Sequence, residues 1–253
     1  MGRVLTPASL RQTEARVWLA DFGSNLAGVV RLSGITCKAG TTLTILHSEI
    51  LQHSQLPGVQ KPDSMRIYTA NLRSAKQRDM YICAGLVGET WAARMTYHGF
   101  RYAEIRSSDP SFNLTASNVQ MLHIHSSLPR RAHVDFSAAT LNRLQAMAVG
   151  AQRSNFMTVP TDCPQRDERL GWLGDVSLSA DSITLNFDAR NFLLGFLDSI
   201  VDEIGVDGSL PAVVPSVCDA WLPGSEWASR GWPTMSYHQS PRPLRGGGVV
   251  ARF

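Results

Sequence analysis

The spacing of apolar residues changes once along the chain, and this change limits the folds that the sequence can adopt. From Arg16 to about Arg106 apolar and polar residues alternate in short runs, which is the pattern of β-strands with one buried face. Glycines such as Gly23 and Gly88 separate the runs, where turns need positive φ. The runs are RVWLADF, AGVVRL, TTLTILHSEIL, DMYICAGL and WAARMTYHGFRYAEIR. We therefore predict an all-β, sandwich-like domain over residues 1–125.

Helical periodicity begins after a linker that carries two Ser/Pro-bearing segments, SSDPSF and SSLPRR. Ser137 can cap a helix whose apolar residues recur on one face. These residues are Leu141, Leu144, Ala148 and Ala151. The stripe predicts a packing surface, and helix is predicted to dominate from Ser137 to about Ile204, within a second domain over residues 126–253.

A second helix is predicted within DARNFLLGFLDSIVDEIGVDG, with Gly205 available to end it. Its apolar residues follow one another at steps of four, namely Phe192, Phe196, Ile200 and Ile204. This spacing also indicates a packing surface rather than a ligand site.

The composition is that of a folded globular protein, with 43% apolar and 18% charged residues. The 24 basic and 21 acidic residues are scattered and give a formal net charge of +3, so we expect no nucleic acid partner. No apolar run approaches the ~20 residues that a membrane helix needs, and the N-terminal residues lack the apolar core of a secretory signal. We therefore expect no membrane partner and a cytoplasmic location.

The cysteines and histidines give no pattern typical of a metal site. The four cysteines stand far apart without a Cys-x-x-Cys step, so free thiols are expected: Cys37, Cys83, Cys163 and Cys218. His123 and His125 share one strand face by period two, which suits a metal, but no third ligand accompanies them. A structural histidine pair is the interpretation we favour, and no metal or cofactor is expected.

The segment between the two helices concentrates chemically useful side chains. It reads DCPQRDERLGWLGD over residues 162–175 and follows the extended, apolar NFMTVP. Pro160 and Pro164 disfavour helix, so Asp162 is predicted on an irregular loop. If a helix begins near Gln165, the side chains of three residues fall on one face at i, i+4 and i+7. These are Glu168, Trp172 and Asp175.

Two carboxylates beside an indole suit sugar hydrolysis, which needs an acid for the leaving oxygen, an apolar wall and acceptors for hydroxyls. A general acid must hold its proton near neutral pH. Burial beside Leu170 and Leu173 would favour this, whereas Arg166 and Arg169 would oppose it. The alternative that these patterns leave open is an acidic first helical turn, whose carboxylates complement the helix dipole and pair with arginines.

The segment DCPQRDERLGWLGD, led by NFMTVPT, resembles the signature segment of the α-L-rhamnosidases of glycoside hydrolase family 78. Two further stretches, DFGSNLAGVVRL with LTILHSEIL and MTYHGFRYAEI, are similar to the β-sandwich that precedes the catalytic barrel in this family. The resemblance runs from roughly Ala15 to Trp232. It implies a β-sandwich followed by the start of an (α/α)6 barrel, and an inverting hydrolase that removes terminal α-L-rhamnose from glycosides or polysaccharides.

The resemblance also implies roles for individual residues. Glu168 would be the general acid, and Arg166 would brace the sugar site. The rhamnose subsite would be lined by Asp162, Trp172, Asp175 and Trp232. The general base of the family lies late in the barrel, so it is expected beyond the residues that match.

The residues after Trp232, PTMSYHQSPRPLRGGGVVARF, are rich in Pro, Arg and Gly and show no helical period. We therefore expect an incomplete barrel and no catalytic turnover by these residues alone. A second hypothesis is a carbohydrate-binding β-sandwich protein with a vestigial barrel. Trp18, Trp91 and Tyr97 are the aromatic residues that would stack on sugar in that case, although a place in the core is expected for each.

Overall fold

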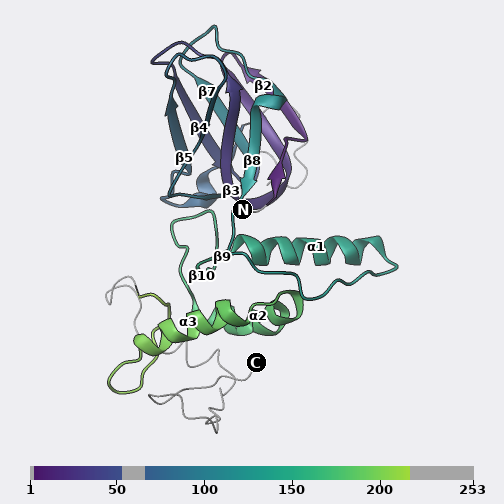
Figure 1. Ribbon diagram of the computed structural model, residues 1–253, viewed down its shortest axis with the longest axis vertical. Helices are drawn as coiled ribbons and strands as arrows, with labels where there is room; N and C mark the ends of the chain where they lie inside the picture. Colours follow the sequence, from purple (N-terminus) through teal and green to yellow (C-terminus); the bar gives the residue numbers. More distant parts are fainter. Residues whose placement is uncertain (1–2, 53–65, 217–253) are drawn as a thin grey trace. The chain divides into compact units, whose positions relative to one another are not determined.

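A computed structural model describes residues 3–52 and 66–216 (Figure 1). The chain forms two compact units. The first comprises Met1–Ser127, Gly150–Met157 and Cys163–Arg169, and the second comprises Leu128–Val149, Thr158–Asp162 and Leu170–Phe253. The segment that carries the predicted chemistry is thus divided between the two units.

The first unit is built on an eight-stranded antiparallel sheet. Its strands are β1 (Val4–Leu5), β2 (Ser9–Glu14), β3 (Val17–Ile35), β4 (Thr42–Ser48), β5 (Arg78–Ile82), β6 (Glu89–Ala92), β7 (His98–Ser107) and β8 (Val119–His123). Two short 3-10 helices, η1 (Ala70–Leu72) and η2 (Ala116–Asn118), lie between strands. The order along the sheet is β1-β8-β3-β7-β4-β5, and β2 and β6 also pair with β3.

Strand β3 joins two runs that the sequence predicts as separate strands on either side of Gly23. Gly23 does adopt a positive φ of 73°, and the register with β7 shifts between Asp21 and Leu26. The chain nevertheless continues along the same neighbour, so the predicted break is a bulge and not a turn. The first part of β3 pairs with β2 and the later part pairs with β8 and β6. With β7, β3 therefore has four hydrogen-bonded partner strands.

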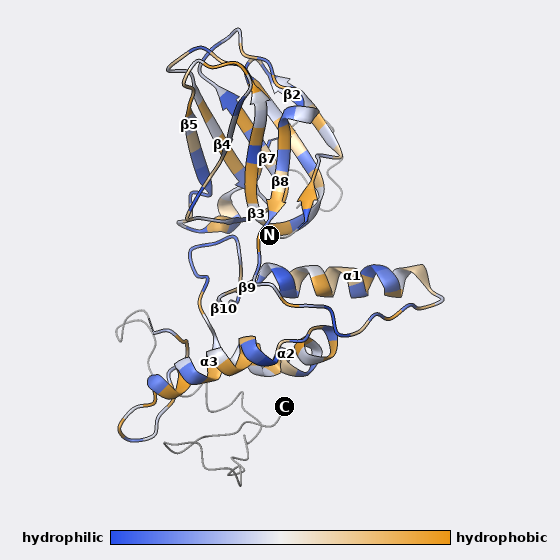
Figure 2. Ribbon diagram, viewed as in Figure 1, coloured by the Kyte–Doolittle hydropathy of each residue, from blue (hydrophilic) through white to orange (hydrophobic). Residues whose placement is uncertain are grey.

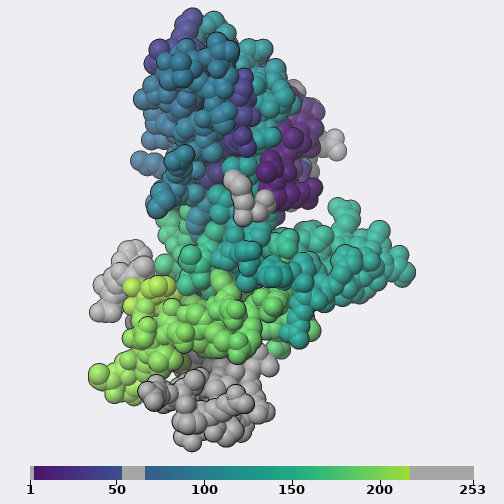
Figure 3. Space-filling model, viewed as in Figure 1, coloured from purple at the N-terminus to yellow at the C-terminus, as the bar shows by residue number. Residues whose placement is uncertain are grey.

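Alternate residues of these strands face a single apolar core, and apolar and polar residues alternate along the ribbon (Figure 2). Trp18 of β3 packs edge-to-face on Phe112 with ring centroids 5.6 Å apart. Figure 3 shows this unit in a space-filling view, with the region of β5 in blue. The predicted order of β structure first and helix second is confirmed.

The helices are α1 (Ala139–Ser154), α2 (Leu173–Asn186) and α3 (Arg190–Asp202), with two short strands, β9 (Phe156–Met157) and β10 (Val159–Pro160), after α1. Helix α1 starts two residues after the predicted cap, Ser137. Its apolar stripe is a poor packing surface among the described residues, because Leu141 and Leu144 remain 44% and 55% exposed.

Helix α3 buries Leu193, Phe196 and Ile200, so only part of its predicted stripe is the face that packs. It ends at Asp202, before the predicted stop at Gly205. The sequence suggested a helix here only on the condition that it began near Gln165, whereas α2 begins at Leu173. It buries Val176, Ala180 and Ile183, which are spaced as one helical face. In the described part of the chain no helix is both long enough and apolar enough to cross a membrane.

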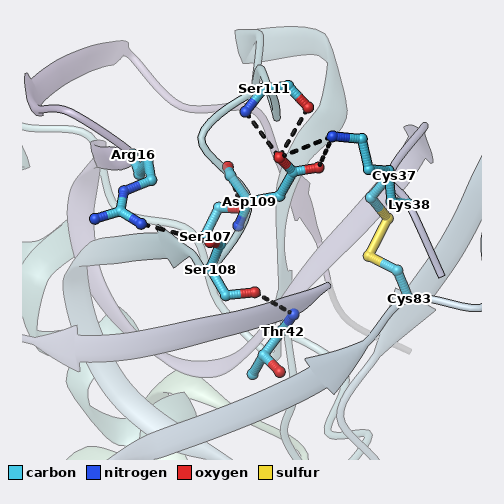
Figure 4. Close-up of polar contacts among 9 residues, drawn as sticks. All are labelled: Arg16, Cys37, Lys38, Thr42, Cys83, Ser107, Ser108, Asp109 and Ser111. Carbon is cyan, nitrogen blue, oxygen red and sulfur yellow. Dashed lines mark hydrogen bonds and ion pairs between the residues drawn. A yellow bond between two sulfur atoms is a disulfide. The ribbon is translucent and has the colours of Figure 1, made fainter. Parts of the chain in front are cut away.

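Cys37 and Cys83 form a disulfide, so the expectation of four free thiols is wrong (Figure 4). The two residues are 46 positions apart, and the sequence gives no sign of their pairing. The sheet brings them together, because β4 pairs with β5 and the N–H of Gly40 donates to the carbonyl oxygen of Cys83 at 2.9 Å. Cys163 is a buried thiol, and Cys218 lies outside the described residues.

A polar cluster next to the disulfide ties two loops of the sheet together (Figure 4). The N–H and Oγ of Ser111 donate to Asp109 Oδ1 at 2.9 and 2.8 Å, and Lys38 Nζ lies 3.3 Å from the same carboxylate. The bonds from Ser111, assisted by Lys38, hold the pKa of Asp109 below its ordinary value.

We expect the double substitution Cys37→Ser with Cys83→Ser to lower the free energy of unfolding by about 4 kcal/mol, which is the loop-closure entropy of a ring of this size. Urea unfolding followed by tryptophan fluorescence measures the change, because Trp18 is buried in the core of this unit. The unsubstituted chain in excess reductant serves as the control and should lose the same amount. Equal stability of the oxidised chain and the variant would contradict the expectation.

Candidate functional site

The segment from Asp162 to Trp172 is irregular, and α2 begins only at Leu173. The predicted helix from Gln165 is therefore wrong, and Glu168 does not share a helical face with Trp172. Pro164 disfavours helix, and Arg169 adopts a positive φ of 57°, which a continuing right-handed helix cannot contain.

Asp162 is hydrogen-bonded to Leu170, at the other end of the irregular segment, and both residues belong to the second unit. Its N–H donates to the carbonyl oxygen of Leu170 at 3.1 Å, and the N–H of Leu170 donates to Asp162 Oδ1 at 2.8 Å. Asp162 is on the irregular loop that Pro160 and Pro164 predict. The sequence did not reveal its second role, which is to bridge the two ends of the loop.

The start of α2 is fixed by residues that follow α3. Trp172 pairs with Val213, and the N–H of Val214 donates to the carbonyl oxygen of Gly171 at 2.9 Å. A Cβ on Gly171 would lie 2.0 Å from the carbonyl oxygen of Val214, so only glycine allows this approach. The half-buried Trp172 precedes the helix, and the exposed Asp175 lies in its first turn. A carboxylate there is also favoured by the helix dipole, as the alternative interpretation expects.

Glu168 lies in the first unit, where its carboxylate meets two guanidinium groups. Oε2 accepts from Arg166 Nε at 2.8 Å and from Arg73 Nη1 at 3.0 Å. The side chain of Glu168 is 17% exposed. Arg166 thus contacts the predicted acid. The contact of Arg73 was not predicted, because Arg73 is 95 positions from Glu168 in the chain. Among the described residues Arg169 forms no ion pair with Glu168, and its guanidinium lies over the ring of Tyr97.

Three further contacts fix the Cys163–Arg169 segment in the first unit. The N–H and Oγ of Ser74 donate to Asp167 Oδ2, which lowers the pKa of that carboxyl. Gln77 Nε2 donates to the carbonyl oxygen of Gln165. At the start of β7, a Cβ on Gly99 would lie 2.8 Å from Pro164 Cγ and 2.9 Å from Gln165 Cβ. The absence of a side chain at Gly99 therefore lets the segment rest directly on the strand.

Three polar side chains lie next to Gln77, namely His47 of β4, Asp79 of β5 and His98 of β7. The carbonyl oxygen of Gln77 accepts from the ring Nδ1 of His47 at 2.9 Å, and this fixes the proton of the neutral ring on Nδ1. His98 Nε2 donates to Asp79 Oδ1 at 2.9 Å, and the two imidazoles stack with centroids 4.1 Å apart. Burial, with a smaller effect of His98, lowers the pKa of His47 to about 3.

The pKa of Asp79 is also lowered. Burial alone would raise it, but the hydrogen bond from His98 and the nearby imidazoles outweigh that effect. His47, Asp79 and His98 offer ligand atoms within 4.8 Å of one another. The hydrogen bonds satisfy only part of this group, because His47 Nε2, Asp79 Oδ2 and His98 Nδ1 are buried without a hydrogen bond to a described residue.

The remaining predicted site residues are distributed as follows. Trp232 lies outside the described residues. His123 is buried, and burial with the neighbouring His125 lowers its pKa to about 4, which keeps the ring neutral. Of the sandwich aromatics, Trp18 belongs to the core and Trp91 stacks on Tyr81 with centroids 5.3 Å apart.

Two family models match the chain. That of the bacterial alpha-L-rhamnosidase concanavalin-like domain matches residues 11–125, and that of the bacterial alpha-L-rhamnosidase 6 hairpin glycosidase domain matches residues 129–239. This chain belongs to the α-L-rhamnosidases of glycoside hydrolase family 78. The predicted family is thus confirmed, together with a concanavalin-like β domain followed by a six-hairpin glycosidase domain.

Curated relatives carry the same family name. The alpha-L-rhamnosidase of Streptomyces avermitilis is 33% identical over 231 residues, which span 91% of this chain and 21% of the relative. An alpha-L-rhamnosidase of Formosa agariphila is 34% identical over 207 residues, which span 82% of this chain and 21% of the relative. The chain therefore spans about a fifth of the length of these relatives.

Two solved structures of α-L-rhamnosidases are similar to this chain. The alpha-L-rhamnosidase from Dictyoglumus thermophilum matches with a TM-score of 0.81 and 31% identity over 90% of this chain and 24% of that chain. The Streptomyces avermitilis alpha-L-rhamnosidase complexed with L-rhamnose matches with a TM-score of 0.77 and 35% identity over 87% of this chain and 20% of that chain. The closed barrel of the family remains a prediction here.

We expect the stability of the chain to fall as the pH drops from 6.5 toward 4. In this window the histidine of the unfolded chain binds a proton that buried His47 does not bind, so each pH unit costs about 1.4 kcal/mol per such group. His47→Gln should reduce the slope of unfolding free energy against pH by about that amount in urea titrations. His133→Gln, which changes a histidine that is 80% exposed, should leave the slope unchanged. The same slope in His47→Gln and the unsubstituted chain would refute this account.

We expect Gly99→Ala to displace the Cys163–Arg169 segment, because the added methyl group overlaps Pro164 and Gln165. Hydrogen exchange of amides in this segment should become faster by tenfold or more, while β4 and β5 stay protected. Gly195→Ala is the matched control, since a Cβ there meets nothing within 4 Å and alanine favours the helix. Unchanged exchange in Gly99→Ala would show that the segment does not depend on this contact.

Proposed function

We propose that this chain is part of an enzyme that hydrolyses terminal non-reducing α-L-rhamnose residues from α-L-rhamnosides with inversion at the anomeric carbon. The observation that carries the proposal is the match of both of its domains to α-L-rhamnosidase domains. A relative solved in complex with L-rhamnose supports the sugar. The substrate is a rhamnose-containing glycoside or polysaccharide, and paired carboxylates can carry out this reaction without a cofactor.

Glu168 is the general acid in this proposal and protonates the glycosidic oxygen as the bond breaks. Arg73 and Arg166 both donate to Glu168 Oε2. The guanidinium groups stabilise the carboxylate that remains after the proton has left, and for the same reason they oppose the protonated form from which the acid must start.

The rhamnose subsite is proposed to be formed by residues that the family resemblance assigns, namely Asp162, Trp172, Asp175 and Trp232. The indole of Trp172 would pack on an apolar sugar face. Asp162 Oδ1 accepts from the N–H of Leu170, and the same carboxylate would accept from a sugar hydroxyl. This double use would make Asp162 a residue that both shapes the loop and binds substrate.

Inversion needs a second carboxylate that activates water on the opposite face of the sugar. We do not assign this role to Glu203, which directly follows α3. Both of its carboxylate oxygens accept a hydrogen bond from the N–H of Ser216. Glu226 lies outside the described residues and precedes the late barrel position that the family resemblance gives the base. A polypeptide of these 253 residues is therefore proposed to bind rhamnosides without turning them over.

The second candidate is a carbohydrate-binding protein that uses the β domain alone. Trp18 is buried and Tyr97 lies under the guanidinium of Arg169, so neither presents a sugar-stacking face readily. Trp91 is half-buried and stacks on Tyr81, which leaves it as the residue on which this candidate depends.

Binding of L-rhamnose, measured by ligand-observed NMR or calorimetry, distinguishes these candidates. We expect saturable binding that Trp172→Ala weakens by about tenfold, since a lost aromatic contact costs up to about 1.5 kcal/mol and 1.4 kcal/mol is a factor of ten in affinity. Trp91→Ala should have no effect. Binding that depends on Trp91 and not on Trp172 would favour the binding protein, and no binding at all would remove the support for a rhamnose site in these residues.

We further expect no hydrolysis of an aryl α-L-rhamnoside by the purified polypeptide, because an acid without its opposing base cannot activate water for inversion. Release of the aryl alcohol measures the rate, with Glu168→Gln as the control for contaminating enzyme. Activity that disappears in Glu168→Gln would confirm the acid and overturn the expected inactivity. Activity that persists in this variant would come from a contaminant or from a different acid.

A further inference from the structure

Three neighbouring strands of the first unit bring two imidazoles and one carboxylate together on the apolar side of the sheet. His47, Asp79 and His98 are too far apart in the chain for local spacing to group them. Ile45 is the register partner of Asp79 and lies two residues before His47, so all three face the core. The ring of His47 also packs edge-on against buried Phe100, with centroids 4.6 Å apart. Polar groups on this face cost free energy unless they find partners.

Both imidazoles place Nε2 next to the carboxylate of Asp79, one at each oxygen. His98 Nε2 lies 2.9 Å from Oδ1, and His47 Nε2 lies 3.8 Å from Oδ2. The stacked rings have centroids 4.1 Å apart, and the three residues offer ligand atoms within 4.8 Å of one another. The side chains of His47, His98 and Asp79 are only 0%, 7% and 9% exposed, so the group is shielded from bulk water.

Two atoms of this group are hydrogen-bond acceptors that face each other. The Nδ1 of His47 donates to the carbonyl oxygen of Gln77, so the Nε2 of the neutral ring carries a lone pair. Asp79 Oδ2 is a carboxylate oxygen, and neither His47 Nε2 nor Asp79 Oδ2 has a hydrogen bond to a described residue. Two acceptors cannot bond to each other. A donor or a cation between them would satisfy both.

Two imidazole nitrogens and a carboxylate are a ligand set that suits Zn²⁺. Metal–ligand distances of about 2.0–2.1 Å place the ligand atoms of a tetrahedral zinc ion about 3.3 Å apart. The 3.8 Å between His47 Nε2 and Asp79 Oδ2 exceeds this by about half an ångström, which a small side-chain rotation closes. A histidine that ligates a metal usually donates its other N–H to a carbonyl or carboxylate oxygen, and His47 already donates to Gln77 in this way.

We propose that His47, Asp79 and His98 form a zinc site in the core of the β domain. Both histidines ligate through Nε2, and the proton of His98 moves to Nδ1 so that each ring binds in its neutral form. A bidentate carboxylate of Asp79, or one water, completes four ligand atoms. The ion has a structural role, because it links β4, β5 and β7 at one point. The site goes beyond the proposed function and does not depend on it.

The test is the zinc content of the 253-residue chain after expression with added zinc chloride and dialysis against zinc-free buffer. We expect one zinc ion per chain by elemental mass spectrometry. His47→Gln and His98→Gln should each lower the zinc content at least tenfold, because each removes a ligand. His125→Gln and His133→Gln are the matched controls and should keep the zinc, since these histidines lie outside the group.

Cobalt(II) in place of zinc reports the ligands without any substitution. We expect the chain expressed with cobalt chloride to show the visible bands of a four-coordinate ion and no near-ultraviolet thiolate band. A thiolate band would assign the metal to a cysteine such as Cys163 and would overturn the proposal. A folded chain without zinc, or zinc that both folded ligand variants retain, would also overturn it. If tryptophan fluorescence shows that the ligand variants do not fold, the cobalt spectrum of the unsubstituted chain decides.

Discussion

The contact between the start of β7 and the Cys163–Arg169 segment is the constraint on which the candidate acid depends. At Gly99 the segment rests on the strand without an intervening side chain, and Gln77 holds its main chain from the β5 side. Behind Gln77 lies the buried group of His47, Asp79 and His98, whose hydrogen bonds are costly to break in a dry interior. Glu168 is thus held by the β unit, although the segment that carries it directly precedes a helix of the glycosidase domain.

The sequence predicted the coarse organisation well, because hydrophobic periodicity reports local burial. The change from strands to helices, the first helix and the irregular loop at Asp162 all follow from residue spacing and from prolines. The same reasoning placed a helix from Gln165, because three chemically suited residues have helical spacing. It failed because the conformation there is set by Gly171 and Arg169, whose roles depend on contacts with distant residues and on local φ.

The missed features share a cause, which is long sequence separation. Arg73 meets Glu168 across 95 positions, and Cys37 meets Cys83 across 46. One pocket of the first unit is lined by cationic residues of β5, β7 and the loop around η1. No local sequence pattern marks these residues as neighbours. Within a single sequence such pairs become visible only once strand order and register are known. The resemblance to a family supplied roles for residues of the signature segment but not for these partners in the β domain.

The disulfide between Cys37 and Cys83 makes the covalent state of this protein depend on where it is made. Glutathione keeps thiol pairs reduced in the cytosol of most cells, whereas an oxidising compartment or exposure to air lets the bond close. The same 253 residues can then exist in two forms that differ by two hydrogen atoms. Material purified from a reducing host would contain a mixture whose proportions drift during storage, so batches that are identical in sequence can differ in heat resistance and in protease sensitivity.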